Sequence, residues 1–168
     1  MNTIIAVIGG SQCSVGEAKA AKVVGRELAR RGFALVCGGL TGVMKAAARG
    51  VAGAGSRTVG ILPGNNHPED ANPYIQIPIT TGIGYTHNAI VVKSAQAVIA
   101  IEGYYSTLSE IAFALQGGIP VVGIGTWEIS REGEGRDPIM RATTPEEAID
   151  RVLAAMGDAP TEAIEHRH

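Results

Sequence analysis

Short apolar runs alternate with segments of helical periodicity along most of the chain. Six runs have the length of buried strands, and we predict strands at 4–8, 33–37, 58–62, 75–79, 97–101 and 120–124. Strands that alternate with helices are joined by right-handed crossovers and build a parallel sheet covered on both faces. The pattern therefore predicts an α/β fold, a Rossmann-like three-layer sandwich with a parallel sheet of about six to seven strands.

Capping signals locate several helix ends. Ser14 and Glu17 have the spacing of a capping box, so a helix is predicted to begin there and to end at Gly32. Thr144 and Pro145 mark the start of the last helix. Because 168 residues favour one domain, we expect a single Rossmann-like ligand-binding domain over 1–156 and a C-terminal tail over 157–168.

The stretch 97–115 combines a buried strand, a tight turn and a helix. Gly103 gives the turn a permissive backbone, and Ser106 and Thr107 are predicted to cap the helix. The residues predicted to face inward are Leu108, Ile111, Ala112 and Leu115. The first N–H groups of a helix lack partners within the helix, so this turn predicts an anion site.

Glycines and small hydroxyl residues also gather at the ends of the other strands. The chain has 23 glycines, which cluster in turns such as 9–13, 38–42 and 80–84, while a long polar loop follows residue 62. In a doubly wound sheet these ends meet at one edge, where ligands bind. No turn matches the dinucleotide fingerprint or the Walker pattern, which argues against NAD and against a P-loop NTPase. We expect a crevice that binds phosphate, the alternative being glycines that only permit tight turns.

Charge and composition limit the classes of partner that we expect for this chain. A net charge of -2, a pI near 6.1 and 4% aromatic residues favour neither nucleic acid nor an anionic membrane. The chain begins without a basic leader, and no apolar stretch reaches the length of a membrane span, so we expect a cytoplasmic protein. Cys13 and Cys37 lack metal-ligand spacing and are expected to be reduced thiols, with no intrinsic metal site.

Several separated motifs occur in an order found in one known group of proteins. The matching segments are 38–44, 60–64, 72–74, 81–85, Asn88 and 106–110. In these segments the chain resembles the family that contains the molybdenum-cofactor carrier proteins, which is related to the Lonely guy cytokinin-nucleotide phosphoribohydrolases, also labelled lysine decarboxylases. The resemblance covers roughly residues 4–125.

The phosphoribohydrolase pattern Pro-Gly-Gly-x-Gly-Thr-x-x-Glu is only partly present. Over 102–110 the chain keeps Gly103, Thr107 and Glu110, while Tyr104 and Ser106 replace glycines. The arginine that precedes the motif in those enzymes falls on His87. Histidine is shorter than arginine, is mostly neutral at pH 7 and lacks its bidentate fork. These differences favour binding over hydrolysis.

The resemblance implies a carrier that holds the molybdenum cofactor, a phosphorylated pterin, and a homo-oligomer, either a dimer or a tetramer. The alternatives are a nucleoside-monophosphate phosphoribohydrolase with Glu110 as catalytic carboxylate, and a non-catalytic nucleotide-binding sensor or structural member. For His87 an exposed position at a helix start remains open, as does a solvated helix-start role for Glu110. The residues expected to bind the ligand are Gly9, Gly10, Ser11, Gly38, Gly39, Gly42, Met44, Pro63, Thr81, Gly82, His87, Asn88, Gly103, Ser106, Thr107 and Glu110.

Overall fold

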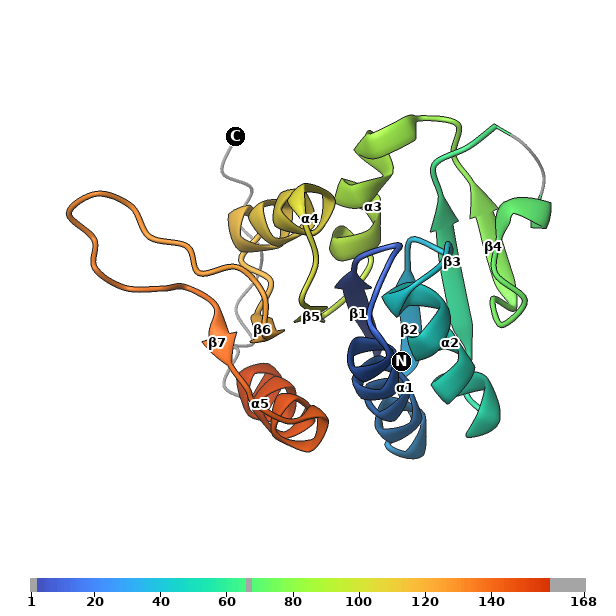
Figure 1. Cartoon of the computed structure of the whole chain (residues 1–168), viewed down its shortest axis with the longest axis horizontal. Coiled ribbons are helices and arrows are strands. Elements are labelled where there is room, and N and C mark those ends of the chain that lie inside the picture. The colour runs from blue at the N-terminus through green and yellow to red at the C-terminus, as the bar shows by residue number, and fades with distance from the viewer. Residues whose placement is uncertain (1–2, 66–67, 158–168) are drawn as a thin grey trace.

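A computed structural model describes residues 3–65 and 68–157. Its seven strands form one all-parallel sheet in the order β4-β3-β2-β1-β5-β6-β7 (Figure 1). The strands are β1 (Ile4–Gly9), β2 (Ala34–Cys37), β3 (Thr58–Leu62), β4 (Ile77–Thr80), β5 (Ala97–Ile101), β6 (Val121–Ile124) and β7 (Met140–Arg141). The predicted α/β fold with a parallel sheet is therefore confirmed, and β7 is the seventh strand.

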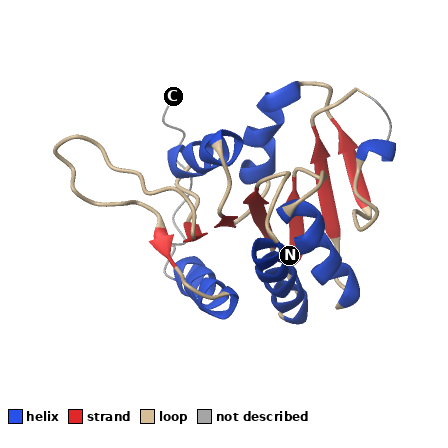
Figure 2. Ribbon diagram, in the orientation of Figure 1, coloured by secondary structure: helices blue, strands red, loops and turns tan. Residues whose placement is uncertain are grey.

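Helices cover both faces of the sheet, which makes the three layers visible in Figures 1 and 2. On one face lie α1 (Val15–Arg30), α2 (Val43–Gly53) and α5 (Pro145–Gly157), and on the other lie α3 (His87–Lys93) and α4 (Tyr105–Gln116). Two single-turn 3-10 helices, η1 (Pro68–Asp70) and η2 (Gly84–Thr86), flank β4. Each helical layer has its own apolar core against the sheet.

The capping predictions for α1 and α5 are confirmed. Ser14 Oγ accepts a hydrogen bond from the Glu17 amide at 3.1 Å, and the Glu17 carboxylate accepts one from the Ser14 amide at 3.3 Å. Thr144 Oγ1 accepts from the Glu147 amide at 3.1 Å. Gly157, which we placed in the tail, is the last residue of α5, and the rest of that predicted tail lies outside the described residues.

Helix α4 differs from its prediction at both its cap and its inward face. Tyr104 is the N-cap residue and makes no side-chain capping bond, so Ser106 and Thr107 lie inside the first turn rather than capping it. Of the four residues predicted to face inward, only Ile111 is buried, whereas Ala112 is exposed and the two leucines are half-buried. The fully inward residues are Thr107, Glu110, Ile111 and Ala114. Apolar residues occur on more than one side of this helix, so their spacing does not specify its orientation.

Helices α1 and α2 touch backbone to backbone. A Cβ atom on Gly25 would lie 2.1 Å from the carbonyl oxygen of Ala47, and one on Gly50 would lie 2.1 Å from that of Lys22. Only glycine permits such an approach at these two positions. The contact fixes the spacing of the two helices that follow β1 and β2.

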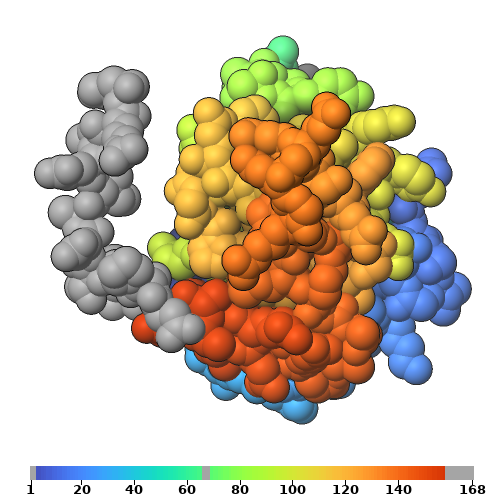
Figure 3. Space-filling view, turned by 90° about the vertical axis from the view of Figure 1, so that its left-hand side faces the viewer, coloured from blue at the N-terminus to red at the C-terminus, as the bar shows by residue number. Residues whose placement is uncertain are grey.

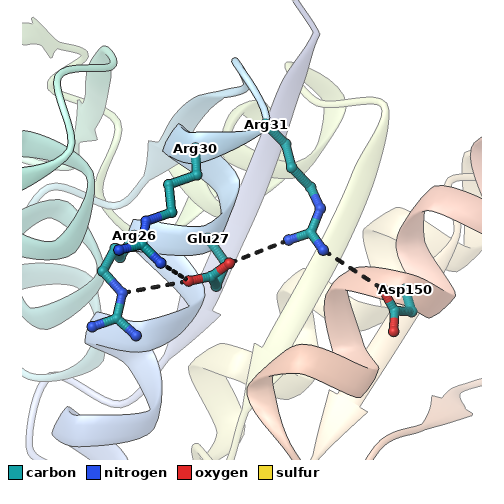
Figure 4. Close-up of polar contacts among 5 residues, drawn as sticks. All are labelled: Arg26, Glu27, Arg30, Arg31 and Asp150. Carbon is teal, nitrogen blue, oxygen red and sulfur yellow. Dashed lines mark hydrogen bonds and ion pairs between the residues drawn. The ribbon is translucent and has the colours of Figure 1, made fainter.

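Ion pairs link the end of α1 to α5, as Figure 4 shows. The Glu27 carboxylate pairs with Arg26 at 3.4 Å, Arg30 at 2.9 Å and Arg31 at 3.5 Å. Arg31 also reaches Asp150 of α5 at 3.7 Å. Pairs with this much solvent exposure contribute little stability each.

A long loop joins β6 to β7. In Figure 3 it lies in orange between α4 and the red α5. Arg141 of β7 holds the base of the loop, because its guanidinium pairs with Asp137 and donates to the carbonyl oxygens of Thr126 and Trp127. Within the described ranges, no helix is both long and apolar enough to cross a membrane.

Candidate functional site

A cavity of about 500 Å³ lies at the carboxyl ends of the central strands. It opens where β1 and β5 are neighbours but lead into helices on opposite faces of the sheet, the position at which doubly wound sheets bind ligands. Its lining comes from the segments that follow β1, β2, β3, β4 and β5 and from the N-terminal parts of α2, α3 and α4. The lining residues are Gly9, Gly10, Ser11, Gly38, Leu40, Met44, Pro63, Gly84, Tyr85, His87, Asn88, Tyr104, Ser106, Thr107 and Glu110.

Most of the predicted site residues line this cavity. The ones that do so are Gly9, Gly10, Ser11, Gly38, Met44, Pro63, His87, Asn88, Ser106, Thr107 and Glu110. The structure does not bring the remaining five to the cavity lining, and these are Gly39, Gly42, Thr81, Gly82 and Gly103. They shape the turns instead, as shown by Gly103, where φ is 94° and a Cβ atom would lie 2.2 Å from Thr107 Oγ1.

Gly42 illustrates why a glycine turn need not be a ligand site. The α2 amide of Val43 donates to the Gly10 carbonyl oxygen at 3.0 Å, and Thr41 Oγ1 donates to the Ser11 carbonyl oxygen at 2.8 Å. The N-terminus of α2 is therefore used to hold the turn after β1. This contact places Gly10 and Ser11 in the cavity wall.

Four lining residues were absent from the predicted set: Leu40, Gly84, Tyr85 and Tyr104. Two of these are tyrosines at the mouth, where Tyr85 is 86% and Tyr104 is 74% exposed. Tyr85 falls within the matching segment 81–85, whereas Tyr104 replaces a glycine of the phosphoribohydrolase pattern over 102–110. Because they lie close in sequence to the predicted residues His87 and Ser106, the sequence contained a signal that could have identified them as lining residues.

Glu110 is buried in the cavity wall without a polar partner. Its side chain lines the cavity while the residue is only 6% exposed, and no described residue makes a hydrogen bond or ion pair with its carboxyl group. Burial raises the pKa of Glu110 to about 8, so that the group is mostly protonated at pH 7. A solvated acid at a helix start is therefore the wrong interpretation for this residue.

His87 is also buried rather than exposed at its helix start. The residue is 6% exposed, and its Nδ1 lies 2.7 Å from the carbonyl oxygen of Ile61. Because a carbonyl only accepts, we assign the ring proton to Nδ1, which leaves Nε2 as an acceptor. Burial lowers the pKa of His87, although the bond to Ile61 acts in the opposite direction, so the ring is neutral at pH 7.

Asn88 connects α3 to α4 through its amide nitrogen. Nδ2 donates to Ser106 Oγ at 3.2 Å and to Ser109 Oγ at 2.9 Å, which uses both amide hydrogens. Oδ1 has no hydrogen-bond partner among the described residues. Every fully buried side-chain nitrogen or oxygen atom of those residues does have a partner, so Oδ1 is not fully buried. Oδ1 therefore retains contact with the open space of the cavity.

The first turn of α4 supplies hydrogen-bond donors at the same cavity. No side chain caps this end, so the amides of Ser106 and Thr107, which line the cavity, and of Tyr105 at the first position of the helix keep the free N–H groups of a helix N-terminus. The positive end of the helix dipole adds to their attraction for an anion. The cavity thus combines a donor-rich helix end with a wall of neutral, buried polar groups.

Cys37 lies beneath this wall as an unreactive thiol. It is fully buried, its Sγ accepts from the Gly39 amide at 3.3 Å, and burial raises its pKa to about 12. In the described part of the chain, no three His, Cys, Asp or Glu side chains gather closely enough to hold a metal ion.

A second, more open groove of about 430 Å³ lies between α1 and α2. Its charged residues are Lys19, Lys22, Lys45 and Arg49. The groove is a potential site for adventitious anions and has to be controlled in any binding measurement.

Known proteins share this architecture over nearly the whole chain. An uncharacterized protein of Archaeoglobus fulgidus is 37% identical over 152 residues, which are 90% of this chain and 95% of the relative. The molybdenum cofactor binding protein of the phototrophic bacterium Rippkaea orientalis is 30% identical, with a TM-score of 0.83 over 93% of this chain and 98% of that one. The Moco carrier protein of Chlamydomonas reinhardtii is 28% identical, with a TM-score of 0.81 over 95% of this chain and 100% of that one.

The family assignment rests on a match that includes every strand and the cavity. The model of the SLOG cluster4 family matches residues 2–149, and so extends from β1 into α5. The resemblance found in the sequence motifs is confirmed, because molybdenum cofactor carriers are among the similar solved structures. The chain belongs to the SLOG cluster4 family.

Proposed function

We propose that the chain is a small-molecule carrier whose ligand is the molybdenum cofactor. The observation that carries this proposal is the pairing of an uncapped helix N-terminus with a buried, neutral polar wall in one cavity of about 500 Å³. That volume lies within the usual range of small-molecule sites. The similarity to a molybdenum cofactor binding protein and to a Moco carrier protein supports the choice of ligand.

The state of Glu110 and His87 supports holding over hydrolysis. Breaking an N-glycosidic bond uses an ionised carboxylate to assist water or to stabilise an oxocarbenium-like centre. Glu110 is mostly protonated at pH 7, and the neutral His87 occupies the position of the arginine in the resembling enzymes. Among the residues that the structure describes, none lining the cavity is therefore a fixed cation that would hold both phosphate and carboxylate.

Phosphoribohydrolase activity is the second candidate, because Glu110 faces the cavity without a partner. It predicts release of free base from AMP or from a cytokinin riboside monophosphate, and loss of that release in Glu110→Ala. Folded protein that releases no base would remove this candidate. Binding of nucleotide with neither turnover nor cofactor uptake would identify a sensor instead.

The carrier proposal is tested by uptake of isolated molybdenum cofactor, measured as saturable binding by equilibrium filtration. The variant Lys22→Ala/Lys45→Ala controls for anions bound in the groove between α1 and α2. We expect that variant to take up cofactor like the wild type. Folded protein that takes up no cofactor while it binds a nucleotide would reject the proposal.

We also propose that the chain forms a homo-oligomer through the α3/α4 layer. Ile77 and Ile79 of β4 are 43% and 45% exposed, and Ile90 of α3 is 38% exposed. Ile79 is paired with Ile61, which packs in the core beneath α3 and α4, so Ile79 faces the same side of the sheet. The neighbouring Val91 and Val92 of α3 are buried in the monomer core and do not belong to this exposed surface.

A further inference from the structure

The buried wall of the cavity presents two hydrogen-bond acceptors and one carboxyl group. His87 presents Nε2 and Asn88 presents Oδ1, because their N–H groups are committed to Ile61, Ser106 and Ser109. Glu110 adds a carboxyl group with no protein partner. No lysine or arginine lines the cavity among the described residues. An anion placed against this wall would meet the lone pairs of His87 and Asn88 and would oppose ionisation of Glu110, so the wall does not suit a phosphate.

The donors lie nearer the solvent, beside this wall. Ser106 is exposed in the first turn of α4, and Tyr104 next to it is 74% exposed, whereas His87, Asn88 and Glu110 are at most 6% exposed. Donors therefore surround the mouth and acceptors the floor. This polarity orients any ligand that has an anionic end and a ring.

We propose that Glu110, with His87 and Asn88 beside it, recognises the N–H edge of an amino-oxo heterocycle, whose phosphate then lies at the first turn of α4. The inference deepens the proposed function by naming the class of ring that the cavity selects. A ring N–H and an adjacent exocyclic amine match the two oxygens of one carboxylate. Pterins and guanine both carry this 2-amino-4-oxo pattern, whereas hypoxanthine lacks the amine.

Binding of such a ring is coupled to the loss of a proton from Glu110. Two donors require both oxygens of Glu110 as acceptors, so the carboxyl group ionises when such a ring binds. The titratable groups that line the same cavity are His87, Tyr85 and Tyr104, and Cys37 lies beneath. The pKa of His87 is lowered and that of Cys37 is about 12, so neither changes its charge between pH 7 and 8. Affinity for the 2-amino-4-oxo ring therefore rises between pH 6.5 and 8 and levels off above.

The test compares GMP with IMP, which differ only in the exocyclic amine, by calorimetry at pH 6.5 and pH 8. We expect the wild type to bind GMP at least tenfold more tightly than IMP, and to release protons on binding GMP when buffers of different ionisation enthalpy are compared. Glu110→Gln should reduce the preference below threefold and abolish the proton release. Glu146→Gln, on the exposed first turn of α5, is the matched control and should behave as wild type.

Equal affinity of the wild type for GMP and IMP would overturn the inference, as would an unchanged preference in Glu110→Gln. A second pair, 6-hydroxymethylpterin and its 2-dimethylamino analogue, repeats the comparison without a phosphate. Absence of binding for both pairs would also overturn it. Cofactor uptake that is unaffected by Glu110→Gln would leave the carrier proposal standing and this inference wrong. GMP selectivity without cofactor uptake would support this inference and reject the carrier proposal.

Discussion

The Nδ1 atom of His87 lies 2.7 Å from the carbonyl oxygen of Ile61, which joins the first residue of α3 to strand β3. The bond sets the tautomer of the ring and holds it in the cavity wall. Gly38 leaves room for this position, since a Cβ atom there would lie 3.3 Å from His87 Cε1 and 2.8 Å from Met44 Sδ. One turn, one strand and one helix therefore cooperate to place a single acceptor atom.

Glu110 makes the folded chain less stable as the pH rises. The pKa of its carboxyl group is about 8 in the folded state against 4.5 for an ordinary glutamate, so the folded chain holds a proton that the unfolded chain has lost. Stability then falls with pH through this interval and is constant above pH 8. From pH 6.5 to 8.5 we expect a loss of about 2 kcal/mol in unfolding free energy, measured by urea denaturation.

Glu110→Gln provides the control for that titration. The amide cannot ionise, so the fall in stability between pH 6.5 and 8.5 should disappear. Below pH 6.5 protonation of His87 favours the unfolded chain, because its pKa is lowered in the folded state. The variant should therefore lose stability as the pH falls further, whereas in the wild type the continuing gain from Glu110 opposes this loss. A wild-type curve that stays flat from pH 6.5 to 8.5 would contradict the burial of a neutral carboxyl group.

Tyr105→Pro tests whether the start of α4 binds phosphate. Proline is tolerated at the first helical position and removes only the backbone N–H there. We expect roughly tenfold weaker binding of a phosphorylated ligand, with helix content unchanged in circular dichroism. Tyr105→Ala also removes the ring that packs on Trp127 but keeps the amide, so it should retain wild-type affinity. Equal losses in the two variants would argue against a backbone anion site.

His87→Arg restores the cation found in the resembling hydrolases. An arginine beside Glu110 should favour the ionised carboxylate and lower its pKa. We expect slow release of adenine from AMP, detected by chromatography, where the wild type shows none. Adding Glu110→Ala to this variant should abolish the release. If the arginine variant folds and its Glu110 ionises but no adenine forms, the scaffold lacks more than a cation.

Ile79→Asp tests the proposed self-association. A carboxylate on the half-exposed face of β4 should disrupt an apolar contact between copies without entering the monomer core. We expect sedimentation velocity to show an oligomer for the wild type and a monomer for the variant at micromolar concentration. Val15→Asp, at an 88% exposed position on α1, is the control that should leave the oligomer intact. A monomeric wild type would reject the proposal.

The alternation of apolar runs and helices was enough to predict the fold, because a parallel sheet buries whole strands and their hydrophobicity is continuous. Strand β3 was predicted at its observed bounds, and the turns after β1, β2 and β5 were correctly placed at one edge. The burial of Glu110 was not predictable in this way. It depends on the rotation of α4 about its axis, which is set by packing against β5 and α3 rather than by local spacing. The same holds for His87, whose partner Ile61 lies 26 positions away.

The backbone contact of α1 with α2 at Gly25 and Gly50 has a mechanical consequence. Helices that touch through main-chain atoms cannot slide past each other by changing side-chain rotamers. The position of the cavity wall that α2 supports is therefore fixed relative to α1. The opposing wall is joined by the side-chain bonds of Asn88 to Ser106 and Ser109, which can break and re-form one at a time. Any change in the width of the cavity is therefore expected on the side of α3 and α4 rather than on the side of α2.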